Sequence, residues 1–227
     1  MSRLNRDPEK AVFTWSGGKD SAFALYNVLK QGDYRVISLL TTVTKDYDRI
    51  SMHGVRKTLL NKQAQSIGLP IDIVYIGKGS SNEDYETMMR GTLKKYLAMG
   101  IRTVAFGDIF LEDIRKYREE NLNKIGMKAH FPIWKQNTKI LADNFINLGF
   151  KAIITCIDTH YLGKEYAGRE YDKAFLNDLP ETVDPCGENG EFHTFVYDGP
   201  IFTKSIIFKK GKVVLRENRF YFCDIYK

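Results

Sequence analysis

Residues 11–21 read AVFTWSGGKDS, and this stretch decides the expected fold. An apolar, β-prone run leads into a hydroxyl, two glycines, a lysine, an aspartate and a second hydroxyl, and a helical pattern of apolar residues follows over 22–29. Glycines let backbone N–H groups approach an anion, and the N-terminus of the following helix adds partial positive charge. Lys19 adds a full charge, and Ser16 and Ser21 add hydroxyl donors. The stretch therefore predicts a phosphate-binding turn between a strand and a helix.

Two common nucleotide loops do not match this turn. The P-loop G-x-x-x-x-G-K-[ST] would need glycine at Phe13 and a hydroxyl at Asp20. The dinucleotide fingerprint G-x-G-x-x-G fails because Gly17 and Gly18 are adjacent and no third glycine follows. The remaining pattern, S-G-G-K-D-S over 16–21, resembles the PP-loop of ATP pyrophosphatases, which cleave ATP between its α- and β-phosphates.

The composition is that of an ordinary globular protein. The chain has 227 residues, 43% hydrophobic and 27% charged, which is enough for one large domain or two modest ones. Its net charge of +6 suits a site for polyanionic ATP and would also suit an RNA-binding enzyme. The basic residues are dispersed, so the charge does not decide the partner, although we do not expect a nucleic acid. The sequence leaves a homo-oligomer open.

The cysteines and the chain start bear on the compartment. The three cysteines, Cys156, Cys186 and Cys223, are far apart and form no C-x-x-C pair, which argues against disulfides and against a thiolate zinc site. No apolar run approaches the roughly 18 residues of a membrane helix, and residues 1–10 are too polar for a secretory signal. We therefore expect a cytoplasmic protein without a membrane partner.

Strand and helix patterns alternate over the first 130 residues. Strands are expected at 34–43, 71–76 and 102–106, and helices at 22–31, 55–67, 83–99 and 109–125, with a loop at 44–51. This alternation predicts an α/β domain, a Rossmann-like parallel sheet with helices on both faces.

Ligands of such sheets bind at the carboxyl ends of the strands. Three expected strand ends carry glycine, aspartate or hydroxyl groups: the loop at 16–21, Thr41 with Thr42, and Gly107 with Asp108. These residues predict a nucleotide crevice.

The pattern changes after about residue 131. A helix capped by Asn137 or Thr138 should reach Gly149, and strands are expected at 151–157, 192–197, 201–208 and 212–226, with a tight hairpin at Lys210-Gly211. We therefore expect a PP-loop domain over 1–135 and a smaller C-terminal α+β domain over 136–227.

A second cluster of polar residues stands at 184–194, DPCGENGEFHT. Two carboxylates, Glu188 and Glu191, lie beside His193 and Thr194 just before an expected strand. On a strand Glu191 and His193 would share one face. The cluster is a candidate functional site, and a polar surface turn with a capping carboxylate is the alternative interpretation.

These motifs, with F-G-D-I at 106–109 and F-P-I-W at 131–134, make the chain similar to the diphthine–ammonia ligase family of the adenine nucleotide α-hydrolase superfamily. The resemblance spans nearly the whole chain; Asn189 departs from the family's usual glycine. It implies an ATP-dependent ligase that adenylates a carboxylate, releases pyrophosphate and captures the acyl-adenylate with ammonia. The acceptor would be diphthine on elongation factor 2 in an archaeon or eukaryote.

The expected site combines both motifs, with ATP and Mg²⁺ as cofactors and ammonium as co-substrate. Lys19, Asp20, Glu188, Glu191 and His193 are the candidate catalytic residues, although which of the last three acts as base stays open. The candidate ligands of ATP are Ser16, Gly17, Gly18, Lys19, Asp20, Ser21, Thr41, Gly107 and Asp108. The candidate ligands of Mg²⁺ are Asp20 and Asp108. The residues expected to bind the acceptor are His53, Glu188, Glu191, His193 and Thr194.

Three other functions compete with this one. A bacterial source would exclude diphthine and favour a small-molecule carboxylate or amide, for instance in corrinoid salvage. A PP-loop tRNA-modifying enzyme is the next alternative, although thiolation would favour C-x-x-C pairs that this chain lacks. A non-catalytic sensor of adenine nucleotides is the third.

Overall fold

A mostly parallel β-sheet forms the N-terminal part of the computed structural model, which describes residues 7–50 and 53–227. Its strands are β1 (Glu9–Thr14), β2 (Tyr34–Thr44), β3 (Arg49–Ile50), β4 (Ile71–Ile76), β5 (Thr103–Ala105) and β6 (Lys128–His130). β1 pairs in parallel with β2 and β5, β2 with β4, and β5 with β6, while the short β3 runs antiparallel to the end of β2. Because β1 is central, Ala11, Val12 and Phe13 are buried on both faces of the sheet.

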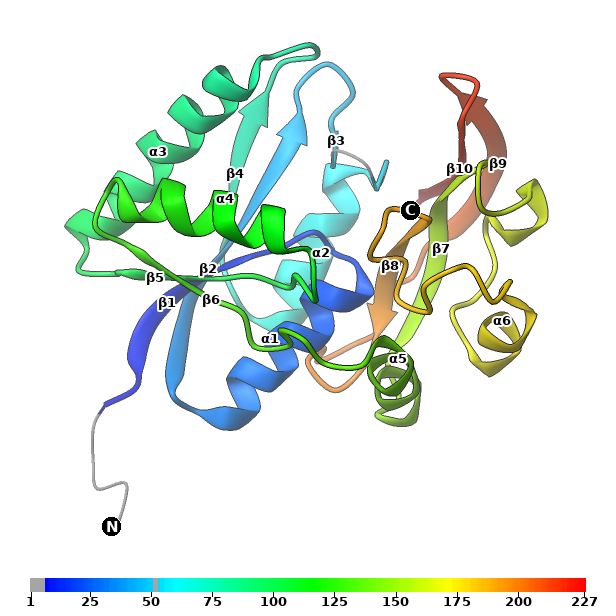
Figure 1. The fold of residues 1–227 in the computed structure, drawn as a ribbon, viewed down its shortest axis with the longest axis horizontal. Helices are drawn as coiled ribbons and strands as arrows, with labels where there is room; N and C mark the ends of the chain where they lie inside the picture. The colour runs from blue at the N-terminus through cyan, green and yellow to red at the C-terminus, as the bar shows by residue number, and fades with distance from the viewer. Residues whose placement is uncertain (1–6, 51–52) are drawn as a thin grey trace.

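Helices cover both faces of this sheet (Figure 1). They are α1 (Lys19–Gln31), α2 (Lys57–Ile67), α3 (Asn82–Ala98) and α4 (Glu112–Asn123). One buried cluster joins α1 and α2 to the sheet and to the C-terminal part of the chain, and a second cluster joins α3 and α4 to the opposite face. The predicted Rossmann-like α/β architecture is confirmed.

Local sequence explains where these helices begin and end. A capping box starts α3, because the Ser81 hydroxyl accepts from the N–H of Asp84 and the Asp84 carboxylate accepts from the N–H of Ser81. α1 and α2 end at Gly32 and Gly68, whose φ angles of 72° and 80° are left-handed. These ends were predicted from the glycines.

A smaller antiparallel sheet of order β8-β7-β10-β9 forms the C-terminal part (Figure 1). Its elements are α5 (Thr138–Asn147), β7 (Lys151–Asp158), η1 (Lys164–Tyr166), α6 (Lys173–Asp178), β8 (Phe192–Asp198), β9 (Lys209–Arg216) and β10 (Phe220–Tyr226). The side chain of Asn137 caps α5 by accepting from the N–H of Ile140. The predicted C-terminal α+β module is confirmed.

The strand predicted at 201–208 is absent from the described structure. Hydrogen bonds from this segment go to the end of α2 instead: Thr203 donates to the Ser66 carbonyl from its N–H and from its hydroxyl, both at 2.8 Å. The N–H of Lys204 is bonded to the Ser66 hydroxyl at 3.1 Å. These contacts attach the segment, which joins β8 to β9 of the C-terminal sheet, to the end of α2 in the N-terminal part.

The hairpin prediction at Lys210-Gly211 is also wrong. Both residues lie inside β9, and the chain reverses at Glu217 and Asn218, whose φ angles are 54° and 51°. Two consecutive left-handed residues form the turn that suits the twist of paired strands, and asparagine tolerates this conformation. Smaller elements that were not predicted are β3, β6, η1 and α6.

The hydrophobic core continues from α1 and α2 into β7, β8 and α5. Phe23 on α1, for example, contacts Phe150 with ring centroids 6.4 Å apart. The division after residue 135 therefore stays a prediction, because the two parts share one core. Within the described ranges, none of the helices has the length and apolar character needed to cross a membrane.

Candidate active site

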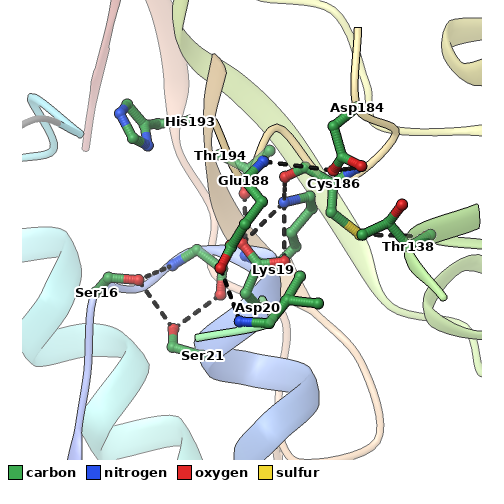
Figure 2. A network of polar contacts seen from close by, with 12 residues as sticks. Ser16, Lys19, Asp20, Ser21, Thr138, Asp184, Cys186, Glu188, His193 and Thr194 are labelled. Carbon is green, nitrogen blue, oxygen red and sulfur yellow. Dashed lines mark hydrogen bonds and ion pairs between the residues drawn. The ribbon is translucent and has the colours of Figure 1, made fainter. Parts of the chain in front are cut away.

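The glycine-rich loop between β1 and α1 folds as the sequence predicts. Gly17 has a left-handed φ of 77°, and Gly18 precedes the first turn of α1. The Ser16 hydroxyl lies 3.1 Å from that of Ser21, which donates to the Gly18 carbonyl at 2.9 Å (Figure 2). The loop therefore presents glycine backbone and two hydroxyls at the N-terminus of a helix, which is the arrangement that binds phosphate.

The second motif meets this loop in space. The N–H of Lys19 donates to the hydroxyl of Thr194 on β8 at 3.0 Å, although the residues are 175 apart in sequence. The Lys19 ammonium also donates to the carbonyl of Cys186 (Figure 2). Both motifs predicted from the sequence thus form one site between the two sheets.

The charge of Lys19 is held inside this site. Its side chain is 4% exposed and bonds both oxygens of Asp20 at 2.8 and 2.9 Å. Burial lowers the pKa of Lys19, but the Asp20 carboxylate and neighbouring groups outweigh burial and leave this pKa raised. Lys19 is therefore a cation at neutral pH, and Asp20 is its counter-ion.

Gln63, on α2, is a residue that the sequence analysis missed. It is fully buried, donates to the carbonyls of Gly17 at 3.0 Å and Val196 at 2.6 Å, and accepts from the Trp15 indole at 3.0 Å. A single amide therefore joins the nucleotide loop to β8. Its one sequence signal is a polar residue within the apolar face of a helix.

Glu188 reaches from the second motif to the end of β5. One carboxylate oxygen accepts from the N–H groups of Ile109 and Phe110, at 2.7 and 3.4 Å. Burial raises the pKa of Glu188 to about 7, and the negative charge of Asp20 adds to this shift. A carboxyl that titrates near neutrality is suited to accept a proton.

Gly107 and Asp108 lie beside the loop but differ in their surroundings. A Cβ on Gly107 would stand 3.0 Å from the backbone of Ser21, so only glycine allows this close approach. Asp108 forms an ion pair with Arg118, at 2.9 and 3.0 Å.

The predicted magnesium ligands are each engaged by a cation, since Asp20 pairs with Lys19 and Asp108 with Arg118. No group of three or more His, Cys, Asp or Glu side chains that could hold a metal is found over 7–50 and 53–227. This arrangement does not fit a magnesium site built from protein side chains, and the metal role of both aspartates stays a prediction.

Glu191 organises the turn of the second motif. It is 1% exposed, and one oxygen accepts from the N–H of Asp184 and the side-chain amide of Asn189, both at 3.0 Å. Its other oxygen is buried without a hydrogen-bond partner among the residues described. The residue that departs from the family pattern, Asn189, therefore contacts a candidate catalytic carboxylate.

The two candidate histidines form a pair at the edge of this network, in which Figure 2 shows His193. The rings of His53 and His193 lie 4.6 Å apart, and Nδ1 of His53 is 3.2 Å from the Thr194 carbonyl. Burial lowers the pKa of His53 to about 4 and the pKa of His193 well below its usual value. The sequence predicted that Glu191 and His193 share one face of a strand. Strand β8 begins at Phe192, so Glu191 lies outside the strand and the alternation of side chains does not extend to it.

Thr41 is buried within β2, one residue past the level at which β1 ends. Its role as an ATP ligand stays a prediction. Of the predicted site residues, those that the structure brings together around the loop at 16–21 are His53, Gly107, Glu188 and Thr194.

Comparison with known proteins agrees with these motifs. The model of the diphthamide synthase N-terminal domain matches residues 9–129, and that of the C-terminal domain matches residues 137–227. The chain belongs to the diphthamide synthase family. The resemblance inferred from the motifs is thereby confirmed.

Several curated relatives of the diphthamide synthase family are similar to the chain, each named diphthine–ammonia ligase. The protein of Schizosaccharomyces pombe is 27% identical over 219 residues, which cover 88% of this chain and 36% of that protein. The protein of Danio rerio is 26% identical, with 89% and 88% covered, and the protein of Homo sapiens is 24% identical, with 88% and 83% covered. The chain thus spans about a third of the fission yeast relative and most of the vertebrate ones.

Proposed function

We propose that this protein is an ATP-dependent ligase that converts a carboxylate into an amide with ammonia, as the names of its relatives suggest. The observation that carries the proposal is the contact of the two motifs, in which Lys19 binds both Thr194 and the Cys186 carbonyl. A nucleotide on the loop would therefore lie beside the polar groups of the second motif.

The proposed reaction has two steps. A carboxylate oxygen of the acceptor attacks the α-phosphorus of ATP, the bond to the β-phosphate breaks, and pyrophosphate leaves. Ammonia nitrogen then attacks the acyl carbon of the adenylate, AMP leaves, and the attacking nitrogen loses a proton. The first step gathers negative charge on phosphate oxygens, which the loop N–H groups and the Lys19 ammonium would stabilise.

Glu188 is the group that we propose to accept the proton in the second step. With its pKa near 7, it ionises close to neutral pH, whereas the histidine pair has pKa values too low for an efficient base. The negative charge of Glu188 and of Asp20 would also favour the ammonium ion near the loop.

We place the adenosine of ATP in a pocket between α3 and α4. Thr14, which immediately precedes the loop, lines it with Leu40 and Phe106, and Tyr85 and Met89 close it from α3. Its lining is mostly apolar and aromatic, with Arg90, Arg118 and Asn121 at its polar side, which suits the base and sugar of a nucleoside.

A substitution on α3 tests this placement. Met89→Trp would fill the pocket and should weaken ATP binding by about tenfold or more in calorimetry. Its neighbour Met88 is 47% exposed, so Met88→Trp is the matched control and should bind ATP normally. Equal affinities in the two variants would remove adenosine from this pocket.

The position of bond cleavage tests the ligase proposal. With ATP labelled at the α-phosphate, pyrophosphate release should need only the acceptor, whereas labelled AMP should be released when ammonium is present as well. Elongation factor 2 bearing diphthine is the acceptor to try first. Turnover with a small carboxylate, and none with diphthine, would show that the acceptor is a small molecule. Release of ADP and orthophosphate would contradict the proposal.

A further inference from the structure

The turn that carries His53 is held at its base by the C-terminal strand. Arg49 on β3 and Arg56 before α2 both pair with the carboxylate of Asp224 on β10, at 2.9 and 2.6 Å. The backbones of Arg49 and Arg56 also form an isolated antiparallel bridge with each other. A single carboxylate near the end of the last strand therefore joins Arg49 to Arg56, which stand on either side of His53 in the sequence.

The same strand contacts the tip of the turn. The Gly54 carbonyl accepts from Arg49 at 2.6 Å. Gly54 has a left-handed φ of 65°, and a Cβ on it would stand 2.6 Å from the ring of Phe222. The ring of a β10 residue thus packs directly on the glycine that follows His53.

From this turn the contacts lead to the nucleotide loop. A Cβ on Gly18 would stand 2.9 Å from the His53 ring, so the imidazole lies against the loop backbone. Nδ1 of His53 lies 3.2 Å from the carbonyl of Thr194, whose hydroxyl accepts from the N–H of Lys19. An unbroken series of contacts therefore links Asp224 to the start of α1.

We propose that Asp224 is a positioning residue for the nucleotide site: by pairing with Arg49 and Arg56 it keeps the His53 ring against Gly18. The inference rests on the proposed function, because it takes the loop to be the ATP site. Arg49 and Arg56 stand on either side of His53, so loss of their shared carboxylate should act on the local position of His53 more than on global unfolding. Without the carboxylate, two neighbouring guanidinium groups would repel each other and draw His53 away from Gly18.

The first test observes His53 directly and needs no substrate. The chain has four histidines, so their ring signals can be followed individually by NMR during a pH titration. In Asp224→Asn the His53 ring should gain water, and its pKa should rise from about 4 toward the usual 6.5. The charged or titratable groups that act on this ring are Lys19 and His193, and neither is changed.

Asp178→Asn is the matched control. Asp178 pairs with Arg169 at 2.7 Å on the same C-terminal part of the chain, and the contacts described for it do not include the turn. The His53 signals should be unchanged in this variant. His53 signals and pKa that stay as in the wild type in Asp224→Asn would overturn the proposal.

The second test measures ATP affinity by calorimetry. Asp224→Asn should bind ATP about tenfold more weakly than the wild type, Asp224→Glu should recover most of the affinity, and Asp178→Asn should bind normally. If Asp224→Asn fails to fold, Arg56→Lys, which keeps the charge but loses the second donor nitrogen, should show a smaller change in the same direction.

The two failures can be told apart. A wild-type protein that does not bind ATP would contradict the proposed function, while the NMR titration would still report whether Asp224 seats His53. A wild type that binds ATP, together with an Asp224→Asn variant of equal affinity, would overturn the positioning role alone.

Discussion

The N–H of Lys19 donates to the hydroxyl of Thr194 across the boundary between the two sheets, at 3.0 Å. This N–H belongs to the first turn of α1, where backbone donors have no partner within the helix. A residue of the second motif therefore satisfies a donor of the nucleotide loop. The two motifs depend on each other for their geometry, and this dependence can be measured.

Thr194→Val should destabilise the protein in the absence of ATP. The substitution keeps the shape of the side chain but leaves the buried N–H of Lys19 without its acceptor, which should lower the free energy of unfolding by about 1–2 kcal/mol. Denaturant unfolding measures this loss. Thr194→Ser keeps the hydroxyl and should be close to the wild type, and a serine variant as unstable as the valine variant would show that the hydrogen bond is not the cause.

Gln63→Leu should lower the free energy of unfolding by more than Thr194→Val does. It removes two donated hydrogen bonds and one accepted bond from a fully buried position, leaving the Gly17 carbonyl and the Trp15 indole without this partner. We expect a loss of about 2–4 kcal/mol in the free energy of unfolding, together with weaker ATP binding. Gln65→Leu changes an exposed residue of the same helix and is the control. A stability loss of the same size in both variants would show that the hydrogen bonds of Gln63 to the loop and to β8 do not stabilise the protein.

Glu188 should make stability depend on pH. Its pKa is raised to about 7 in the folded protein by burial and is 4.5 for an ordinary glutamate, so folding favours the protonated form. The stability that this group contributes is therefore present below about pH 4.5 and is lost as the pH rises through 7. Glu188→Gln should lack this loss, so its stability relative to the wild type should increase between pH 4.5 and 7 in unfolding curves. A constant difference across this window would contradict the assignment.

Glu191→Gln and His193→Ala should separate binding from chemistry. Both residues belong to the second motif, which we place on the acceptor side, so both variants should bind ATP normally in calorimetry but form little amide product. In Glu191→Gln the remaining carbonyl oxygen can still accept from Asp184, which should preserve the turn. Loss of ATP binding in a folded variant would show that the nucleotide and acceptor sites are not divided in this way.

The sequence by itself determined the order of elements and the local geometry of the loop. Residues 11–21 predicted the strand–turn–helix, because an apolar, β-prone run leads into two glycines before a helical pattern. Glycine can adopt a left-handed backbone and leaves backbone N–H groups open to an anion. The glycines at 32 and 68 predicted the helix ends for the same local reason. Where the local signal was ambiguous, as for the Lys210-Gly211 pair inside β9, the prediction failed.

Only the tertiary structure decided which partner each polar side chain has. Lys19 turns to the Cys186 carbonyl, Asp108 pairs with Arg118, and Gln63 and Asp224 reach the loop and its histidine turn from elements that carry no motif. Burial makes an unpaired polar group costly, so these groups take whichever partners the packing of the two sheets brings within reach. The longest of these contacts in sequence span well over 100 residues, and no local pattern can specify them.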